Sequence, residues 1–400
     1  MKIAVLQDDY PPHHAGGAGV IAKNLATAYV HTGHTVLVIT TVQDRALAGE
    51  ETTEGVRIKR LYTSYPGRWR AYLSLYNPQV VSEIKKELET FHPDIVHVHN
   101  VHVHLSYHSI AIAARSGALV FLTAHDTMLF DYGKSLNTKK VSAFALWRAQ
   151  GLRFNLLSNL FIRHYVRYVT KVVAVSHALK EALTNNGFKN IEVVHNGIDA
   201  SIWTRPNGVD EYKKSLGIGE QAILFGGRLS GSKGARKLIE ALSIIVKTIP
   251  EAQLLVVGNK DAYTEGMLSY AQKLGVRGSL VFTGWLVGDE LLRAYYAATV
   301  VAVPSLYLDP FPTINLEAMA CRKPVVATCF GGSSEVVKDT VTGFIVDPHN
   351  AEALATKLKE LLEDKTTNKA FGEAGYERVT TEFSLDAQAK EYEALFATIH

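Results

Sequence analysis

The sequence predicts an α/β protein made of two doubly wound parallel sheets. Short runs rich in Val, Ile and Leu recur along the chain, and most are apolar throughout, which is typical of parallel strands buried on both faces. Amphipathic helical patterns separate these runs, and such alternation builds a parallel sheet. The 400 residues are also too many for one hydrophobic core, so two domains are expected.

The predicted strands form two groups of six. In the first half they are "KIAVLQ", "TVLVIT", "DIVHVH", "LVFLTA", "KVVAVS" and "EVVHNG", and in the second half "AILFGG", "QLLVVG", "LVFTG", "TVVAVPS", "PVVAT" and "TGFIV". Helical patterns between them include residues 22–32, 80–91, 233–247 and 351–364. Turn residues cluster in "NGIDASIWTRPNG", so we expect Rossmann-like domains over residues 1–203 and 204–384, with an extra last helix at 385–400.

Composition narrows the class of protein. Hydrophobic residues make up 47% and charged residues 20%, the balance of a globular protein. Cys321 and Cys329 cannot form a disulfide framework, which favours a reducing compartment. The first apolar run is cut off by Asp8 and Asp9, and no run is long enough to span a bilayer. We therefore expect a cytoplasmic protein.

Positive charge is concentrated in one segment. Residues 1–205 hold 22 Lys and Arg against 15 Asp and Glu, and no acid occurs between Asp131 and Glu181. Aromatic and leucine side chains interleave with the cations of residues 134–171. The pattern predicts either a peripheral contact with an anionic membrane at its inner face or the solvated face of a surface helix. Nucleic acid is not expected, because no recognition motif accompanies the charge.

Candidate site residues follow the predicted strands, since ligands of open α/β sheets bind at the carboxyl ends of strands. In "FGGRLSGSKG", Arg228 follows a strand and Lys233 stands at the entrance to a helix. Two cations five residues apart at a helix start suit a diphosphate. In "GGAG", Gly17 and Gly19 precede a helix expected to begin near Val20, so backbone N–H groups can approach an anion. These glycines lie too far from the strand for a dinucleotide fingerprint.

The stretch "YLDPFPTINLEAMA" carries Asp309 and Glu317 on either side of a Pro-Phe-Pro turn. The prolines forbid a continuous helix and predict a bend that brings both acids to one site. Thr313 is expected to cap the following helix, with the N–H groups near Ile314 facing a phosphate. Glu317 suits a ribose diol, and Asp309 is expected to face whatever is attached to the phosphates.

Histidines supply a further group of candidates. His125, beside Asp126, closes the strand "LVFLTA" and could bond a sugar hydroxyl, relay a proton or be structural. "HVHNVHVHLSYH" would place His97 and His99 on one face of a strand, which suggests a metal site. No carboxylate or cysteine completes that set, and the chain has no Asp-x-Asp motif, so we expect neither metal nor cofactor.

These clusters, in this order, resemble the retaining, metal-independent glycosyltransferases of family 4, which have the GT-B fold. The resemblance covers essentially the whole chain. It rests on "PPHHAGGAGV", "DIVHVHN", "TAHD", "VVAVSHALKE", "VVHNGID", "GGRLSGSKG", "LLVVG", "VFTGW", "DPFPTINLEAMA" and "PVVATCFGGSSEVV".

The resemblance implies an acceptor-binding first domain, a nucleotide-sugar-binding second domain, and a last helix that packs back on the first. It implies catalytic roles for His125, Asp309, Arg228 and Lys233. The implied donor-binding residues are Arg228 and Lys233 at the diphosphate, Glu317 at the ribose, Trp285 and Leu286 at the base, and Gly17, Gly19, Phe311, Thr313, Ile314 and Glu335 elsewhere around the donor.

The chain departs from the family pattern at two positions. Asp309 stands where the family has the first of two glutamates, and its shorter side chain disfavours a direct covalent role. Pro312 stands where many members have Gly, which removes one N–H from the phosphate site. We expect transfer of a hexose, glucose or a similar sugar, from a UDP-sugar to a glycan or lipid-linked acceptor in polysaccharide or glycolipid biosynthesis. A UDP-sugar 2-epimerase of the same fold and a non-catalytic nucleotide-sugar-binding protein remain open.

Overall fold

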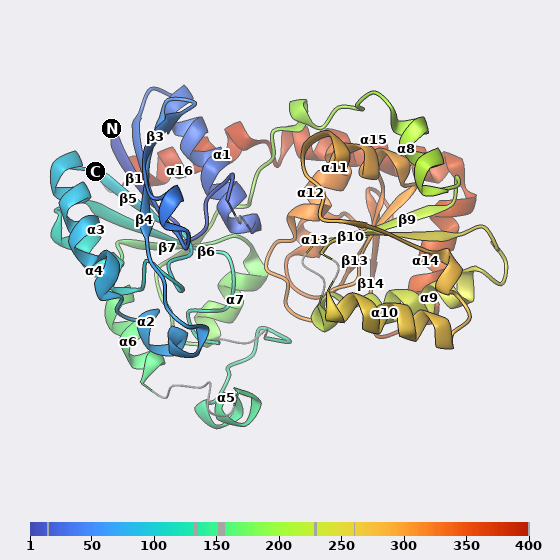
Figure 1. Cartoon of the computed structure of the whole chain (residues 1–400), viewed down its shortest axis with the longest axis horizontal. Helices are drawn as coiled ribbons and strands as arrows, with labels where there is room; N and C mark the ends of the chain where they lie inside the picture. Colours follow the sequence, from blue (N-terminus) through green and yellow to red (C-terminus); the bar gives the residue numbers. More distant parts are fainter. Residues whose placement is uncertain (14–15, 132–134, 151–156, 228–229, 260, 399–400) are drawn as a thin grey trace. The chain divides into compact units, whose positions relative to one another are not determined.

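The computed structural model describes residues 1–13, 16–131, 135–150, 157–227, 230–259 and 261–398. The chain divides into two compact units (Figure 1): unit 1 holds Met1–Asn196 and Leu385–His400, and unit 2 holds Gly197–Ser384. Each unit is built around a largely parallel sheet, which confirms the predicted fold class. Within the described ranges, no helix is both long enough and apolar enough to cross a membrane.

Unit 1 contains an eight-stranded sheet in the order β3-β4-β2-β1-β5-β6-β7-β8. Its neighbouring strands are parallel, with β1 in the middle paired to β2 and β5, and only β3 and β4 pair antiparallel. The strands are β1 (Lys2–Leu6), β2 (Thr35–Val42), β3 (Gly49–Thr53), β4 (Val56–Tyr62), β5 (Ile95–Val98), β6 (Leu119–Ala124), β7 (Lys171–Ala174) and β8 (Ile191–Val193).

The hairpin of β3 and β4 is a fold element that the sequence analysis missed. All five residues of β3 are exposed, so the strand lacks the apolar run by which the other strands were predicted. Charged pairs across the hairpin hold it instead: Arg57 donates to Glu50, and Arg60 donates to Glu51 at 2.6 Å. Cross-strand pairs of opposite charge stabilise an edge that has little apolar surface.

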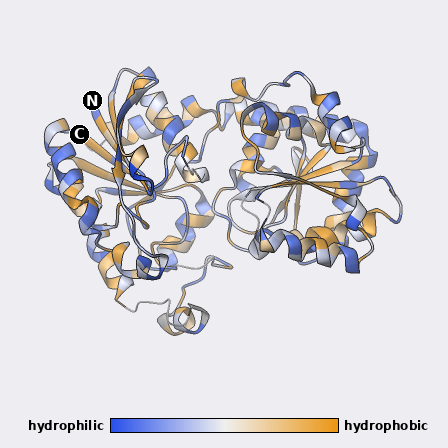
Figure 2. Cartoon of the chain, in the orientation of Figure 1, coloured by the Kyte–Doolittle hydropathy of each residue, from blue (hydrophilic) through white to orange (hydrophobic). Residues whose placement is uncertain are grey.

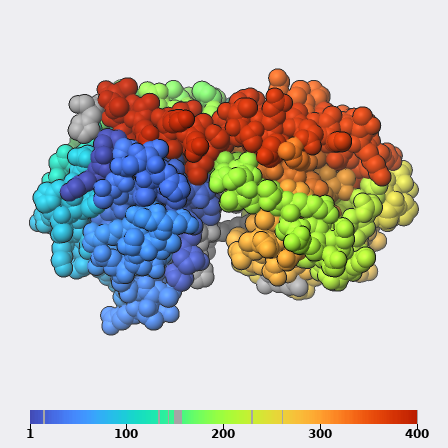
Figure 3. Space-filling model, turned by 90° about the horizontal axis from the view of Figure 1, so that it is seen from above, coloured from blue at the N-terminus to red at the C-terminus, as the bar shows by residue number. Residues whose placement is uncertain are grey.

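Helices cover both faces of the unit 1 sheet. They are α1 (Gly17–His31), α2 (Arg70–Leu73), α3 (Pro78–Phe91), α4 (His108–Arg115), α5 (Ala143–Gln150), α6 (Ser158–Val166), α7 (His177–Asn185) and α16 (Leu385–Ala397). The last of these, α16, packs against α1, and its Tyr392 and Phe396 are fully buried in the core of unit 1. Figure 3 shows the C-terminal residues, in red, lying against the blue N-terminal ones.

Unit 2 contains a six-stranded, entirely parallel sheet in the order β11-β10-β9-β12-β13-β14. The strands are β9 (Ala222–Gly226), β10 (Gln253–Val257), β11 (Leu280–Gly284), β12 (Val300–Val303), β13 (Val325–Thr328) and β14 (Gly343–Val346). The helices are α8 (Val209–Leu216), α9 (Ala235–Ile245), α10 (Ala262–Lys273), α11 (Gly288–Ala297), α12 (Thr313–Ala320), α13 (Ser333–Val336), α14 (Ala351–Glu363) and α15 (Lys365–Thr381). Figure 2 shows apolar strands at the centre of the unit and polar residues on the outer sides of its helices.

The strand order places one switch point in each sheet. In unit 2 the chain builds outward from β9 to β10 and β11, then returns to the other side of β9 with β12. In unit 1 the same reversal places β5 beside β1. Ligands of doubly wound sheets bind where the order reverses, at the carboxyl ends of the strands. Ligand-binding residues are therefore expected directly after β9 and β12 in unit 2, and directly after β1 and β5 in unit 1.

Candidate active site

The switch point of unit 2 joins two of the predicted site residues directly. Lys233 ends a short 3₁₀ turn (Gly231–Lys233) after β9, and Asp309 follows β12. The Nζ atom of Lys233 donates to Oδ2 of Asp309 at 2.6 Å, and the hydroxyl of Ser305 donates to the same oxygen at 2.8 Å. The Asp309 side chain is 8% exposed and that of Lys233 is 23% exposed. Asp309, which was expected to face the group attached to the phosphates, therefore belongs to a largely buried ion pair.

This ion pair keeps Lys233 charged. Burial lowers the pKa of the ammonium, but the Asp309 carboxylate and the Tyr307 side chain outweigh it, so the pKa lies above its ordinary value. The ammonium also lies 5.4 Å from the centre of the Tyr307 ring. Asp309 accepts from one of the three N–H donors of the ammonium. A cation fixed in this way suits a phosphate oxygen.

Two glycines allow the loops of this site to approach each other. Gly234, at φ +81°, follows Lys233, and a Cβ there would lie 1.9 Å from the carbonyl oxygen of Pro304 at the end of β12. Gly331, at φ +74°, faces the backbone of Asp309 in the same way, with 2.1 Å from a Cβ to the Asp309 carbonyl oxygen. That carbonyl accepts from the N–H of Gly332 at 2.9 Å. Backbone contacts that any side chain would obstruct thus fix both partners of the ion pair.

Helix α12, which follows Asp309 in the chain, carries Glu317. The helix begins at Thr313 with Pro312 in the cap position, so the prediction that Thr313 caps it is wrong: Pro312 has extended φ and ψ, and Thr313 is already the first helical residue. Thr313 lies one turn before Glu317 on this helix. Burial raises the pKa of Glu317, and hydrogen bonds from Tyr295 and Thr313 partly oppose that rise.

Tyr295, in α11, is a residue that the sequence analysis missed. Its hydroxyl donates to Oε2 of Glu317 at 2.5 Å, and its ring is almost fully buried. This contact fixes one oxygen of the Glu317 carboxylate. A tyrosine in an amphipathic helix gives no sequence signal for such a role, because most are simply half-buried surface residues.

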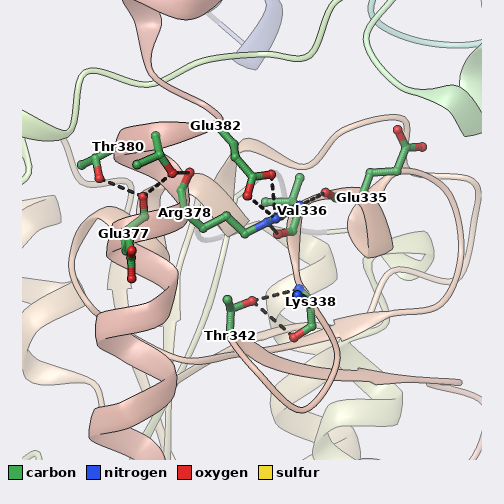
Figure 4. Close-up of polar contacts among 9 residues, drawn as sticks. Glu335, Val336, Lys338, Thr342, Glu377, Arg378, Thr380 and Glu382 are labelled. Atoms are coloured by element: carbon green, nitrogen blue, oxygen red, sulfur yellow. Dashed lines mark hydrogen bonds and ion pairs between the residues drawn. The ribbon is translucent and has the colours of Figure 1, made fainter.

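The loop that holds Glu335 is fixed from both sides. Its first end is hydrogen bonded to the Asp309 backbone through Gly332, and the short helix α13 follows. At the second end, Arg378 reaches from α15 and donates Nη2 to the carbonyl of Glu335 at 3.0 Å and Nε to that of Val336 at 2.9 Å (Figure 4). The same guanidinium pairs with Glu382 at 2.7 Å. Arg378 thus satisfies the last carbonyls of α13, which have no partner within so short a helix.

The other donor-binding candidates of unit 2 differ from one another in packing and exposure. Ile314 lies against the end of β9, 3.7 Å from where a Cβ on Gly226 would stand. Phe311 is buried against Phe383, with ring centres 5.9 Å apart, so its side chain belongs to the packing of the loop. Trp285 follows β11 and is 53% exposed, with the half-buried Leu286 beside it. Arg228 lies outside the described residues.

The switch point of unit 1 holds His125. Its Nε2 atom lies 2.8 Å from Nδ1 of His99, which follows β5, and the two rings are stacked. Burial lowers the pKa of His125 to about 4 and that of His99 well below its ordinary value, so both imidazoles are neutral near pH 7. A neutral His125 suits a hydrogen bond to a hydroxyl better than it suits the donation of a proton as an acid. His97 is structural, since Tyr29 and Thr123 bond both of its ring nitrogens.

Asp8, directly after β1, is a further residue whose role was not predicted. Its buried carboxylate accepts from the N–H groups of Val103, His104 and Leu105 at 2.7 to 2.9 Å. Burial raises its pKa to about 6, against the opposing effect of His102 and of these N–H groups. The sequence signal for this role is the position of Asp8 directly after a predicted strand.

The glycine motif of unit 1 also differs from expectation. Helix α1 begins at Gly17, three residues before the predicted start, with extended Gly16 as its cap. Gly19 is buried in the first turn, and its N–H donates to the Gly16 carbonyl at 2.9 Å. Gly17 is exposed at the first helical position. The two glycines therefore form the N-terminus of the helix itself and not a loop before it.

The fold and site define the class of protein. Two doubly wound units, each with a switch point in its sheet, have the architecture of the GT-B fold. Sucrose-phosphate synthase from Thermosynechococcus elongatus has the same fold, with a TM-score of 0.80 at 22% identity over 100% of this chain and 98% of that one. The Anabaena protein Alr3699/HepE, solved in complex with UDP-glucose, gives a TM-score of 0.77 at 20% identity over the whole of both chains.

Sequence comparison gives the family. Residues 15–202 match the model of Glycosyltransferase Family 4, and residues 209–378 match that of Glycosyl transferases group 1. An uncharacterised glycosyltransferase of Methanocaldococcus jannaschii is 29% identical over 98% of this chain and 96% of its own length. A glycogen synthase of Mycobacterium tuberculosis is 26% identical over 96% of this chain and 91% of its own. The chain belongs to the family 4 glycosyltransferases and is a glycosyltransferase of the GT-B fold.

Proposed function

We propose that this glycosyltransferase moves a hexose, glucose or a similar sugar, from a UDP-sugar to a glycan or lipid-linked acceptor, with retention of the anomeric configuration and without a metal ion. Unit 2 binds the donor and unit 1 the acceptor. The observation that carries the proposal is the largely buried ion pair of Lys233 and Asp309, four residues before the start of α12, the helix that carries Glu317. The crystallised complexes of Alr3699/HepE with UDP and UDP-glucose support the choice of donor.

The chemistry follows from where charge develops. Cleavage of the anomeric bond places negative charge on the leaving diphosphate. The Lys233 ammonium, which its partners keep protonated, and the amides of Thr313 and Ile314 stabilise that charge, each by roughly 2–4 kcal/mol in a closed site. Arg228 is predicted to act with them. Glu317, held by Tyr295, accepts from the ribose hydroxyls, and His125 bonds a hydroxyl of the transferred sugar. With retention, the acceptor hydroxyl attacks from the side that the diphosphate leaves, and the diphosphate takes its proton.

Calorimetry with UDP tests the donor site. We expect Lys233→Ala to weaken UDP binding by at least about tenfold, because it removes a charged hydrogen-bond donor to phosphate. Lys237→Ala is the matched control: Lys237 lies one turn further on, in α9, and pairs with Glu240 at 2.8 Å. Equal UDP affinity in both variants would reject the proposal. Turnover that survives EDTA would support chemistry without a metal, and loss of turnover that a divalent cation restores would contradict it.

A non-catalytic nucleotide-sugar-binding protein is a second candidate, because the shorter Asp309 replaces the family glutamate and is already bound to Lys233. Incubation with a labelled UDP-hexose separates the cases. Transfer to an added acceptor supports the glycosyltransferase reaction, and a new nucleotide sugar formed without acceptor indicates an epimerase. Binding without turnover across a broad acceptor panel indicates the non-catalytic alternative.

A further inference from the structure

Unit 1 carries a concentration of exposed apolar side chains that its fold does not require. Nine of the eighteen large hydrophobic side chains exposed in the described residues lie in two stretches, 69–76 and 136–161. Phe144 and Leu160 expose 68% and 65% of their surface, so they are not the rim of a core. Exposed apolar side chains gathered in this way mark an interaction site. We use the name aromatic-basic surface for six of these side chains together with the exposed cations of the same two stretches. The six side chains are Trp69, Tyr72, Phe144, Trp147, Leu160 and Phe161.

Contacts connect the two stretches, although they are far apart in the sequence. The ring of Tyr76 lies 4.9 Å from that of His108, which lies 5.7 Å from that of Tyr165 in α6. Arg163, also in α6, donates to the carbonyl of Asn186, and the side chain of Asn186 accepts from the backbone of the segment that leads into α5 at 2.9 Å. Figure 1 shows α2, α5 and α6 at the same end of unit 1. The two stretches therefore belong to one region of unit 1.

The charge of this region identifies the chemistry of its partner. No Asp or Glu occurs in residues 132–180 or in residues 67–76. Among the exposed cations are Lys139 and Lys140 before α5, Arg148 within it, and Arg68, whose guanidinium lies 6.0 Å from the centre of the Trp69 ring. Aromatic and leucine side chains interleaved with cations, without acids, match the boundary between lipid acyl chains and anionic headgroups.

We propose that the aromatic-basic surface docks unit 1 on an anionic lipid bilayer. The aromatic and leucine side chains enter the headgroup boundary, and the cations meet lipid phosphates. The protein binds the bilayer peripherally. The inference includes the α2 stretch, which the basic segment of the sequence alone did not indicate. It is independent of the proposed donor and acceptor, because none of these residues is assigned to the reaction.

Vesicle flotation without substrates tests this inference. The protein is mixed with vesicles of phosphatidylcholine alone or with about 30% phosphatidylglycerol, at low and at high salt. We expect flotation only with the anionic vesicles and only at low salt. Lys139→Gln with Lys140→Gln is expected to weaken binding about thirtyfold, because each cation near an anionic surface contributes about fivefold. Lys365→Gln with Lys369→Gln, two exposed lysines of α15, is the matched control and is expected to stay within about twofold.

The apolar part of the surface is tested separately by Phe144→Ser with Trp147→Ser, whose rings lie 6.0 Å apart. We expect this variant to lose flotation while it keeps the thermal unfolding profile of the parent protein, because both side chains are exposed. Equal flotation with neutral vesicles, no flotation at all, or full binding by both surface variants would overturn the proposal. So would a dimer, found by sedimentation, that the Phe144/Trp147 variant dissolves, because a second copy of the chain would then cover this surface.

Discussion

Replacement of Asp309 by Asn separates the structural role of the ion pair from its role in binding. The change removes one negative charge and keeps the shape of the side chain, so its remaining oxygen can still accept from Lys233 and Ser305. At the observed 2.6 Å, the gross attraction between two unit charges is about 6 kcal/mol for an effective dielectric constant of 20. Desolvation offsets much of this attraction.

We expect Asp309→Asn to lower the free energy of unfolding by about 2 kcal/mol. Loss of one partner of a buried pair costs roughly 3–5 kcal/mol, but Lys233 keeps 23% of its side chain in water and a neutral hydrogen bond remains. For a unit of this size, that loss lowers the melting temperature by about 4–8 °C. Thermal unfolding measures it. Asp347→Asn is the control: its carboxylate pairs with His349 at an exposed position, so a change below about 0.5 kcal/mol is expected.

UDP affinity moves in opposite directions for the two partners of the pair. Asp309→Asn leaves the Lys233 ammonium uncompensated, so we expect UDP to bind at least as tightly as to the parent protein. Lys233→Met removes the cation and is expected to weaken UDP binding by about tenfold, although it destabilises the fold by a similar amount. The double variant should unfold with a coupling free energy of at least about 1 kcal/mol. Additive stabilities, or a joint loss of UDP affinity, would refute the reasoning.

Three further predictions concern single contacts. Tyr295→Phe removes the hydroxyl that donates to Glu317 and is expected to weaken UDP binding about fivefold, which calorimetry measures; unchanged affinity would show that this contact only packs α11. Gly234→Ala forces a Cβ against a backbone carbonyl and should lower the free energy of unfolding, measured with denaturant, by over about 3 kcal/mol. Gly217→Ala is the control: Gly217 has a similar φ but open space around it, so a loss of about 1 kcal/mol is expected. Equal losses would contradict the geometry. Asp8 binds its proton more tightly in the folded state, where its pKa is about 6 against an ordinary value of 3.8. The free energy of unfolding therefore falls by up to about 3 kcal/mol as the pH rises from 4 to 6. Asp8→Asn should flatten this pH dependence, which unfolding measured at a series of pH values checks.

The fold class and most elements could be read from local patterns. Apolar runs, most of them uninterrupted, predicted twelve strands, and a strand of the structure overlaps each run. A parallel strand buried on both faces needs apolar residues throughout its length. The hairpin of β3 and β4 escaped for the opposite reason. Strand β3 lies at the sheet edge, where exposed residues and charged pairs replace buried apolar ones, so its sequence resembles a loop. Strand β4 lies between β3 and β2, and its buried apolar residues alternate with cations instead of forming an apolar run.

Only some features of the site were visible in the same way. Lys233, Asp309, Glu317 and His125 were found because a strand or a turn precedes each one in the sequence. Their partners were not found. Tyr295 and Arg378 lie within ordinary helices, and no pattern distinguishes them from surface residues until the helices are packed.

The sequence by itself determined which residues stand at strand ends, since apolar runs and turn residues are local properties of the chain. The tertiary structure decided which strand ends are neighbours. Lys233 and Asp309 are 76 positions apart, and β10 and β11 come between their strands along the chain. They form an ion pair because the sheet order reverses at β9 and sets β12 beside it. Strand order depends on how whole layers pack, and no short stretch of sequence contains that information.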